Sequence, residues 1–217
     1  MKKVMSGIIL FSFLFLVKIN GQKIETNLLN QEYWKIEAEF PDSTFFNWNN
    51  KKVKMDSKGG VTLWLNQKLK GHYIIEYDRK INLTDSYFPR ISDINQFWNA
   101  QLSNDYSFNT NGRFSNYDNF QMMYFGFGGN SNKTTRFRYY NGQGERVLLK
   151  EYLDKQHLIN STKIYHIKTE VNKNQTSVWI NNVLYFQDSS TKLNSGYFGL
   201  RMTWSSQTIS NFKITKF

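Results

Sequence analysis

The chain of 217 residues contains no cysteine. It therefore has no disulfides, no thiolate ligands for zinc and no cysteine nucleophile. Familiar catalytic and nucleotide-binding motifs are also absent, since the sequence has no H-E-x-x-H, no G-x-S-x-G and no Gly-Lys-Ser/Thr. GFGGN at 126–130 reads as a turn, because the helical pattern of a dinucleotide-binding motif does not follow it.

Only one long apolar run occurs, from Ile8 to Val17, and it follows Lys2 and Lys3. This is the layout of a signal peptide, and the run is too short to span a bilayer. We expect cleavage after Gly21, with no lipid anchor because no cysteine follows. Residues 22–217 then form a single secreted or periplasmic domain, since no linker, repeat or low-complexity segment interrupts them.

The chain is basic, with a formal net charge of +11. Removal of residues 1–21 takes away three lysines and no acidic residue, which lowers the charge to +8. A basic balance favours an acidic partner. No run rich in lysine and arginine marks a tail that binds nucleic acid. We therefore expect an acidic polysaccharide as partner, no nucleic acid, no membrane span, and a monomer.

No long stretch shows helical periodicity. Short runs rich in aromatic and β-branched residues recur between Asn, Asp, Ser and Gly, which is typical of an all-β sandwich or barrel. In residues 33–40, Trp34 and Ile36 alternate with Lys35 and Glu37, as expected for a strand with one face in the core. Further strands are predicted at 61–65, 72–80, 95–102, 148–152, 164–171, 177–180, 196–204 and 209–217.

Residues 117–140 predict a β-hairpin whose turn is Gly-Gly-Asn-Ser-Asn-Lys. Side chains alternate along a strand, so one face of the returning strand carries Thr135, Phe137 and Tyr139 and belongs in the core. The other face carries Thr134, Arg136, Arg138 and Tyr140, with the two arginines about 7 Å apart. Two neighbouring guanidinium groups repel each other and favour an anionic partner, although a solvated sheet face has the same pattern.

Several segments together resemble a known family. They are Val178–Asp188, Gly196–Arg201, Ile209–Ile214, and the central pieces 90–98 and 124–140. In this order they resemble a concanavalin-like (laminin-G-like) jelly-roll family of exported bacterial proteins that is associated with polysaccharide degradation and is mostly uncharacterised. The resemblance implies a jelly-roll β-sandwich of two antiparallel sheets. It leaves the reaction open, because jelly rolls include lyases, hydrolases and lectins.

The first candidate chemistry is β-elimination of a uronate-containing glycan, which needs a group that neutralises a carboxylate, a base and an acid. We expect arginine and asparagine side chains to bind the substrate, namely Arg136, Arg138, Arg90, Arg201, Asn95 and Asn130. Tyrosine and histidine would transfer protons, and the candidates are Tyr124, Tyr140, His72 and His166. Each has a structural alternative, because buried tyrosines and strand histidines are common in cores.

The second candidate chemistry is glycoside hydrolysis, which needs two facing carboxylates. Glu37 and Glu39 share a strand face, as do Glu76 and Asp78, but the sequence lacks the Glu-x-Asp-x-Glu of laminarinase-like enzymes. We expect Glu37 and Glu39 to lie on a solvated outer face.

A third possibility is a carbohydrate-binding module that binds without catalysis. Trp98 and Trp48 stand in polar surroundings and are candidates for stacking on sugar rings, whereas Trp34 and Trp64 are expected in the core. No redox cofactor is expected and no metal ligand set is predicted. A structural calcium ion remains open, with Asp188, Asp42 or Asp56 as sources of carboxylate oxygens.

Overall fold

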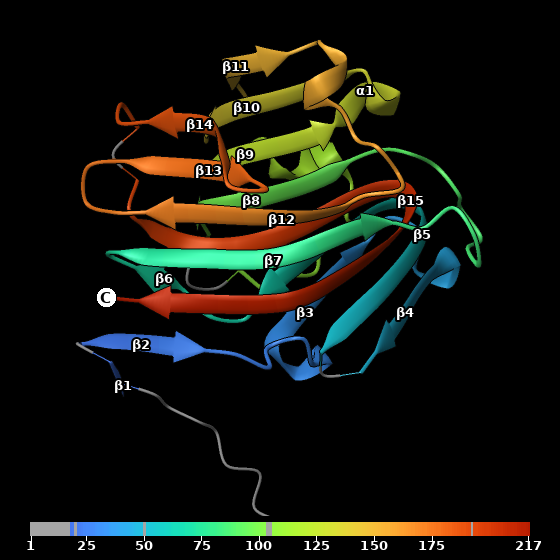
Figure 1. Cartoon of the computed structure of the whole chain (residues 1–217), viewed down its shortest axis with the longest axis horizontal. Coiled ribbons are helices and arrows are strands. Elements are labelled where there is room, and N and C mark those ends of the chain that lie inside the picture. The colour runs from blue at the N-terminus through green and yellow to red at the C-terminus, as the bar shows by residue number, and fades with distance from the viewer. Residues whose placement is uncertain (1–17, 20, 50, 103–105, 192) are drawn as a thin grey trace, which may run out of the picture.

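The computed structural model describes residues 18–19, 21–49, 51–102, 106–191 and 193–217 (Figure 1). Its strands form two antiparallel layers that pack face to face. Sheet I consists of β3 (Trp34–Ala38), the second half of β5 (Lys52–Leu65), the first half of β15 (Ser195–Lys216), β8 (Ile94–Gln101), β9 (Gln121–Gly128), β10 (Thr134–Asn141) and β11 (Arg146–Tyr152).

Sheet II consists of β4 (Thr44–Trp48), the first half of β5, the second half of β15, β7 (Tyr73–Ile81), β12 (Ile164–Val171), β13 (Thr176–Ile180) and β14 (Val183–Asp188). The short strands are β1 (Lys18–Ile19), β2 (Gln22–Glu25) and β6 (Leu69–Lys70). Single-turn helices occupy Gln31–Tyr33, Pro41–Ser43, Phe114–Tyr117, Lys155–His157 and α1 (Gly129–Asn132). The predicted all-β fold of two antiparallel sheets is confirmed.

The long strands β5 and β15 belong to both sheets. Their mutual register shifts between Thr203 and Ser205, and Trp204 at this point has a φ of 42°. The bend carries each strand from one layer into the other, so the two sheets are joined through hydrogen-bonded backbone at one end of the sandwich (Figure 1).

The core between the sheets follows the alternation of the sequence. From β10, Thr135 and Phe137 point into it and are fully buried, while Tyr139 is partly buried against it. Phe125 and Phe127 from β9 and Ile167 from β12 complete this part of the core. The predicted core face of the hairpin is therefore correct.

The outer face of sheet I carries a second layer of buried, mainly aromatic residues. Residues 106–120 cross this face, and residues 103–105 before them lie outside the described part of the chain. Phe114 and Tyr117 from this segment pack on Phe97 of β8. The buried members of this layer are Trp64, Phe97, Ala100, Leu102, Tyr117, Met122, Tyr124 and Tyr140. Both faces of sheet I are consequently covered over part of their area.

Glu37 shows the consequence of this cover. It was expected on a solvated face, but only 1% of it is exposed. Its carboxylate accepts hydrogen bonds from Trp64 Nε1 (2.8 Å), Tyr117 Oη (2.8 Å), Tyr106 Oη (2.6 Å) and the Thr110 amide (3.0 Å). The expectation was wrong because alternation shows which side of a strand is polar, and not whether another segment covers that side.

We predict that Glu37→Gln lowers the free energy of unfolding by about 1.5–3 kcal/mol, the range for buried hydrogen bonds to a charged group. The glutamine amide nitrogen cannot accept a hydrogen bond, so at least one of these four donors would lose its partner. Urea denaturation measures the effect. The matched control is Glu39→Gln on the same strand face, where the carboxylate is partly exposed and bonds the Gly60 amide and Arg113. Equal, small effects in both variants would contradict the prediction.

The apolar run Ile8–Val17 of the expected signal peptide lies outside the described residues, so the prediction for residues 1–21 stays a prediction. Lys18–Ile19 pairs with β2. In the part of the chain that the structure describes, no helix has the length and apolar character to cross a membrane.

Candidate functional site

The candidate site is a cavity of about 270 Å³ on the outer face of sheet I, beside the segment 106–120. We call it the arginine pocket. Strands β8, β9, β10 and β15 supply most of its wall. The turn after β9 and Phe114, from the covering segment 106–120, complete the wall. Its lining residues are Asp93, Asn95, Phe114, Tyr124, Gly126, Gly129, Asn130, Thr134, Arg136, Arg138 and Thr203.

Two arginines of β10 give the pocket its positive charge. Arg136 and Arg138 are half-buried, and both line the cavity, as their shared strand face predicted. Arg136 Nε donates to Glu151 of β11, which neutralises part of its charge. Arg138 forms no ion pair with any described carboxylate, and its guanidinium lies 5.9 Å from the ring centre of Tyr124. The charge of Arg138 is therefore available to an anionic ligand.

Tyr124 of β9 lies directly across the strand pair from Arg138. Its ring is 6% exposed, and its hydroxyl extends over Gly126, where an added Cβ would come within 2.2 Å of it. Gly126 therefore leaves the space that the phenol occupies. Burial raises the pKa of Tyr124, and the nearby Asp93 carboxyl raises it further. The phenol remains protonated at neutral pH and can donate a proton or a hydrogen bond into the pocket.

Asp93 and Asn95 enter the pocket from the start of β8. Asp93 has a positive φ of 60°, and its carboxyl accepts a hydrogen bond from the Ser92 hydroxyl. Burial raises the pKa of Asp93 above the usual aspartate value, although Arg90, Arg201 and Arg79 oppose the shift. Asn95 is 2% exposed, and its Oδ1 has no hydrogen-bond partner among the described residues. A buried polar atom without a partner is costly, which favours a ligand at this position.

Arg201 and Tyr140 lie beside the pocket and beneath the covering segment. Arg201 is 1% exposed, donates to Thr62 Oγ1 (2.9 Å) and to the Gly112 carbonyl (2.8 Å), and lies 5.0 Å from the Phe114 ring centre. Tyr140 is fully buried, and burial raises its pKa to about 12. Neither side chain lines the cavity, so both support the wall of the pocket.

Arg90 lies at the rim. It donates hydrogen bonds to Ser131 Oγ (3.1 Å) and to the Thr203 carbonyl (3.4 Å). These two bonds connect the turn after β9 with the bend of β15. Asn130, in that turn, lines the pocket with a φ of 52°. Of the residues expected to bind substrate, five therefore line the pocket or its rim on one side of the molecule: Arg136, Arg138, Asn95, Asn130 and Arg90.

The structure does not bring His72, His166 or Trp98 to this pocket. His72 stacks on Phe217 (4.0 Å) and pairs with Glu170. His166 of β12 pairs with Asp78 (2.8 Å) and lies beside a separate cavity on sheet II. Trp98 is fully buried between the sheets, where its Nε1 donates to Thr176 Oγ1 (2.8 Å), so it cannot stack on a sugar. These residues lie on the other sheet or face the core.

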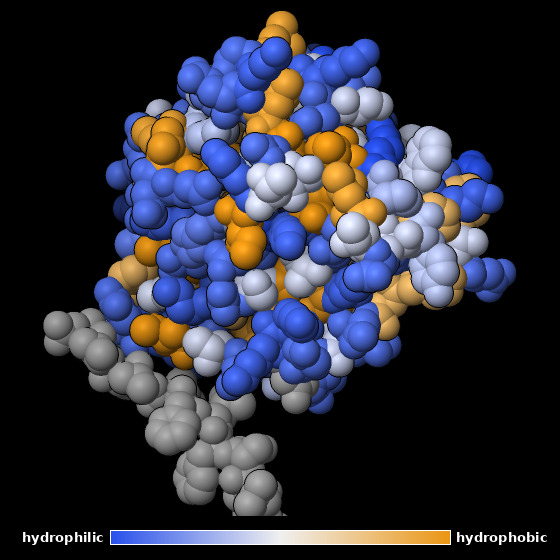
Figure 2. Space-filling model, turned by 45° about the vertical axis from the view of Figure 1, so that its right-hand side comes forward, coloured by the Kyte–Doolittle hydropathy of each residue, from blue (hydrophilic) through white to orange (hydrophobic). Residues whose placement is uncertain are grey.

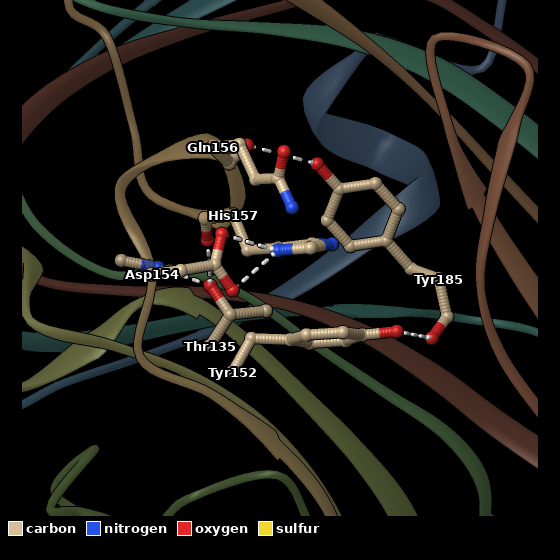
Figure 3. Close-up of polar contacts among 7 residues, drawn as sticks. Thr135, Tyr152, Asp154, Gln156, His157 and Tyr185 are labelled. Carbon is tan, nitrogen blue, oxygen red and sulfur yellow. Dashed lines mark hydrogen bonds and ion pairs between the residues drawn. The ribbon is translucent and has the colours of Figure 1, made fainter.

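His157 belongs to a cluster at the edge strands (Figure 3). Its ring stacks on Tyr152 (3.9 Å) and meets the edge of Tyr185 (5.0 Å), while Asp154 bonds its Nδ1 (2.7 Å). Tyr152 also donates to the backbone carbonyl of Tyr185 (2.6 Å), and the Thr135 hydroxyl donates to the His157 carbonyl (2.5 Å). The cluster fastens β11 to β14 across the two sheets and has a structural role.

Most of the other carboxylates considered for hydrolysis or calcium already have partners. Glu76 pairs with Lys213 (2.8 Å), Asp56 accepts from the Tyr87 and Phe88 amides, and Asp188 accepts from Ser190 and Thr191. Asp42 lies in an exposed single-turn helix. Within the described residues, no group of three or more His, Asp or Glu side chains is arranged to hold a metal ion.

Among the residues that line the pocket, sequence reasoning did not name Asp93, Phe114 or Thr203. Asp93 had no usable signal in the sequence, because it precedes β8 with a positive φ of 60°, so strand alternation does not predict where its side chain lies. Phe114 had none either, since it reaches the pocket from a segment far from β10 in the chain.

Comparison with known proteins agrees with this architecture. Residues 55–212 match the model of a family described as a domain of unknown function, DUF6250. The chain belongs to the DUF6250 family. No curated protein matches this DUF6250 chain.

Solved structures show its fold. A protein of unknown function with a galectin-like fold from Bacillus subtilis has a TM-score of 0.68 at 14% identity, over 87% of this chain and 93% of that one. The carbohydrate-binding module CBM66 from the same organism has a TM-score of 0.55 at 14% identity, over 82% and 94%. An endo-β-1,3-glucanase from Pyrococcus furiosus has a TM-score of 0.58 at 8% identity, over 92% and 97%. These similarities confirm the predicted jelly-roll sandwich.

Proposed function

We propose that this protein binds an acidic polysaccharide in the arginine pocket and cleaves it by β-elimination next to a uronate. Four groups converge in one cavity, and this observation carries the proposal. They are the Arg138 guanidinium and the Asn95 amide oxygen, which have no ion-pair or hydrogen-bond partner, respectively, among the described residues, the buried Tyr124 phenol, and the Asp93 carboxyl with its raised pKa. The similar folds of a carbohydrate-binding module and a glucanase support a sugar as the ligand.

Arg138 and Asn95 would hold the C6 carboxylate of the uronate. Guanidinium matches a carboxylate with two parallel hydrogen bonds, and this pairing is strong in a partly buried site. When the C5 proton leaves, negative charge builds up on the carboxylate, so the same contacts stabilise the transition state more than the bound substrate. Arg136 shares its charge with Glu151 and would serve mainly as a second contact for the glycan.

Asp93 and Tyr124 would transfer the protons. The Asp93 carboxylate takes the proton from C5, the electron pair forms the C4–C5 double bond, and the bond from C4 to the leaving oxygen breaks. The Tyr124 phenol gives its proton to that oxygen, and a proton then returns from Asp93 to Tyr124 through water. A carboxyl with a raised pKa is a stronger base than an ordinary aspartate, and a phenol with a raised pKa stays protonated at neutral pH, so it holds the proton that the leaving oxygen receives.

Elimination fits the pocket better than hydrolysis. Glycoside hydrolysis needs two carboxyl groups on either side of the scissile bond. Among the described residues that line the pocket, Asp93 supplies the one carboxyl, while Glu37 is enclosed by its four donors. The predicted signal peptide fits an enzyme that meets its polysaccharide in the periplasm or outside the cell.

The Arg138→Ala variant tests the charge of the pocket. We expect the KM or Kd for an acidic polysaccharide to rise about 10- to 100-fold, because hydrogen bonds to charged groups contribute about 1.5–3 kcal/mol. The assay follows the ultraviolet absorbance of the unsaturated uronate product with a panel of polygalacturonate, alginate and glucuronan. Thermal unfolding should be nearly unchanged, because Arg138 forms no ion pair with a described residue.

Two controls make this test specific. Lys80→Ala removes an exposed positive charge from β7 in sheet II and should leave the kinetics unchanged. A neutral glucan should give no unsaturated product with any variant. If wild-type protein is retained on an acidic glycan gel but gives neither unsaturated product nor new reducing ends, the protein binds without catalysis and the lyase assignment is wrong.

A further inference from the structure

Exposed aromatic rings gather where β5 and β15 bend from one sheet into the other. Phe40 is 41% exposed, Trp204 54% and Tyr87 73%. Together with Lys58, Phe88, Pro89 and Arg90 they line an open groove of about 810 Å³. We call it the aromatic groove. Figure 2 brings the right-hand side of the Figure 1 view forward and shows separate orange hydrophobic patches among blue hydrophilic residues.

Trp204 has an unusual backbone for its residue type. Its φ of 42° lies in the left-handed region, which a bulky side chain rarely adopts. The positive φ coincides with the register shift between β15 and β5, and more than half of the Trp204 surface is exposed. The irregular strand therefore presents an indole ring to solvent, and such bulges often lie beside binding sites.

Positive charges flank the rings of the groove. The Lys58 ammonium lies 5.5 Å from the centre of the Phe40 ring, and the Arg90 guanidinium lies 5.4 Å from the Trp204 ring. Phe88 and Pro89 also line the groove. Such a surface combines apolar faces with cations, which complements a ligand that has both apolar faces and anionic groups.

The groove adjoins the arginine pocket. Thr203 lines the pocket and immediately precedes Trp204 in β15. Arg90 lines the groove and also bonds Ser131 and the Thr203 carbonyl at the pocket rim. Arg90 therefore connects the rim of the pocket with the groove.

We propose that the aromatic groove binds further sugar units of the same acidic polysaccharide whose uronate occupies the arginine pocket. The C–H faces of the sugar rings stack on Trp204 and Tyr87, and Lys58 and Arg90 pair with carboxylates along the chain. This inference rests on the proposed function and extends it. Binding in the groove would make the protein selective for chains of several sugar units.

Calorimetric titration with acidic oligosaccharides tests the groove. Disaccharides and hexasaccharides of polygalacturonate, alginate and glucuronan are compared, with every protein carrying Tyr124→Phe so that the ligands stay intact. We expect the parent to bind the longer ligand at least about tenfold more tightly, as aromatic anchors typically contribute. Trp204→Ala should lose this gain and bind the disaccharide within about twofold of the parent, while Trp204→Phe should keep most of the gain.

Two further variants separate binding from folding. Trp179→Ala is the matched control, because Trp179 on β13 of sheet II also has a lysine over its ring, Lys168 at 4.4 Å. It should leave both affinities unchanged. Trp204→Asn places a residue that tolerates positive φ at the strained position, so its thermal midpoint should equal or exceed that of the parent while the length-dependent affinity is lost.

The outcomes are distinct. If the parent binds the longer ligand more tightly and Trp204→Ala keeps that gain, the groove proposal is wrong and the proposed function stands. The same holds if the parent binds both ligands equally. A parent that binds neither ligand overturns both proposals.

Discussion

Replacing Phe137 by alanine is expected to lower the free energy of unfolding by about 3–5 kcal/mol, the usual cost of removing a buried aromatic ring. Phe137 is fully buried at the centre of β10. Its ring stacks between Phe125 of β9, at 4.7 Å, and Phe186 of β14, at 4.4 Å. The Phe137 ring therefore connects the two sheets, and its replacement by alanine leaves a cavity between Phe125 and Phe186.

Urea denaturation of Phe137→Ala and of Leu148→Ala makes the comparison. Leu148 lies on the neighbouring strand β11 and is 50% exposed, so its truncation should cost far less. A near-neutral Phe137→Ala would mean that the hairpin has its faces inverted. Arg136 and Arg138 would then point toward the core, and the arginine pocket could not exist.

The hairpin also shows how much the sequence predicts. Alternation with a period of two correctly separated Phe137 from Arg136 and Arg138, because a strand has only two faces and one of them must be apolar. The tight turn between β13 and β14 has an equally local cause, because Asn181 and Asn182 both have positive φ, of 50° and 65°, which asparagine tolerates. Such features depend on residues close together in the chain, so local pattern and backbone preference are sufficient to find them.

The errors come from contacts between distant segments. Glu37 was placed in solvent, but residues 106–120 cover its side of sheet I and enclose it. Trp98 was considered a sugar platform because its sequence neighbours are polar. Those neighbours, Asn99 and Gln96, are themselves buried and bonded to Tyr73 and Tyr77 between the sheets. Polarity in the sequence does not distinguish a solvated side chain from a buried one that has a hydrogen-bond partner.

The residues that were missed have the same origin. Trp204 lies in a strand whose sequence alternates normally, and only the bend between the sheets turns its ring outward with a positive φ. Asp93 becomes notable through its raised pKa, which depends on burial by several elements. By contrast, five of the seven residues predicted to bind substrate reach one pocket and its rim, because four of them come from β8 and from the hairpin and its turn.

Tyr124→Phe is expected to lower the turnover of an acidic polysaccharide about 10²- to 10⁴-fold, the usual contribution of a positioned general acid. The substitution removes only the hydroxyl. The ring keeps its contacts with Phe97 (5.6 Å), Phe114 (5.4 Å) and Tyr140 (5.9 Å), so the thermal midpoint should change little. KM should change far less than kcat, since the hydroxyl acts on the leaving oxygen in the transition state.

The pH dependence of wild-type and Tyr124→Phe protein tests the assignment of both proton-transfer groups. Asp93 must be ionised to act as base, so turnover should rise as pH passes its pKa, which burial raises above the usual aspartate value. Tyr124 must be protonated, and its raised pKa should keep turnover from falling until strongly alkaline pH. In Tyr124→Phe the acid limb should remain at the same position with a reduced plateau. A shift of the acid limb in Tyr124→Phe, with an unchanged plateau, would assign the acid role to another group and leave Tyr124 as part of the pocket wall.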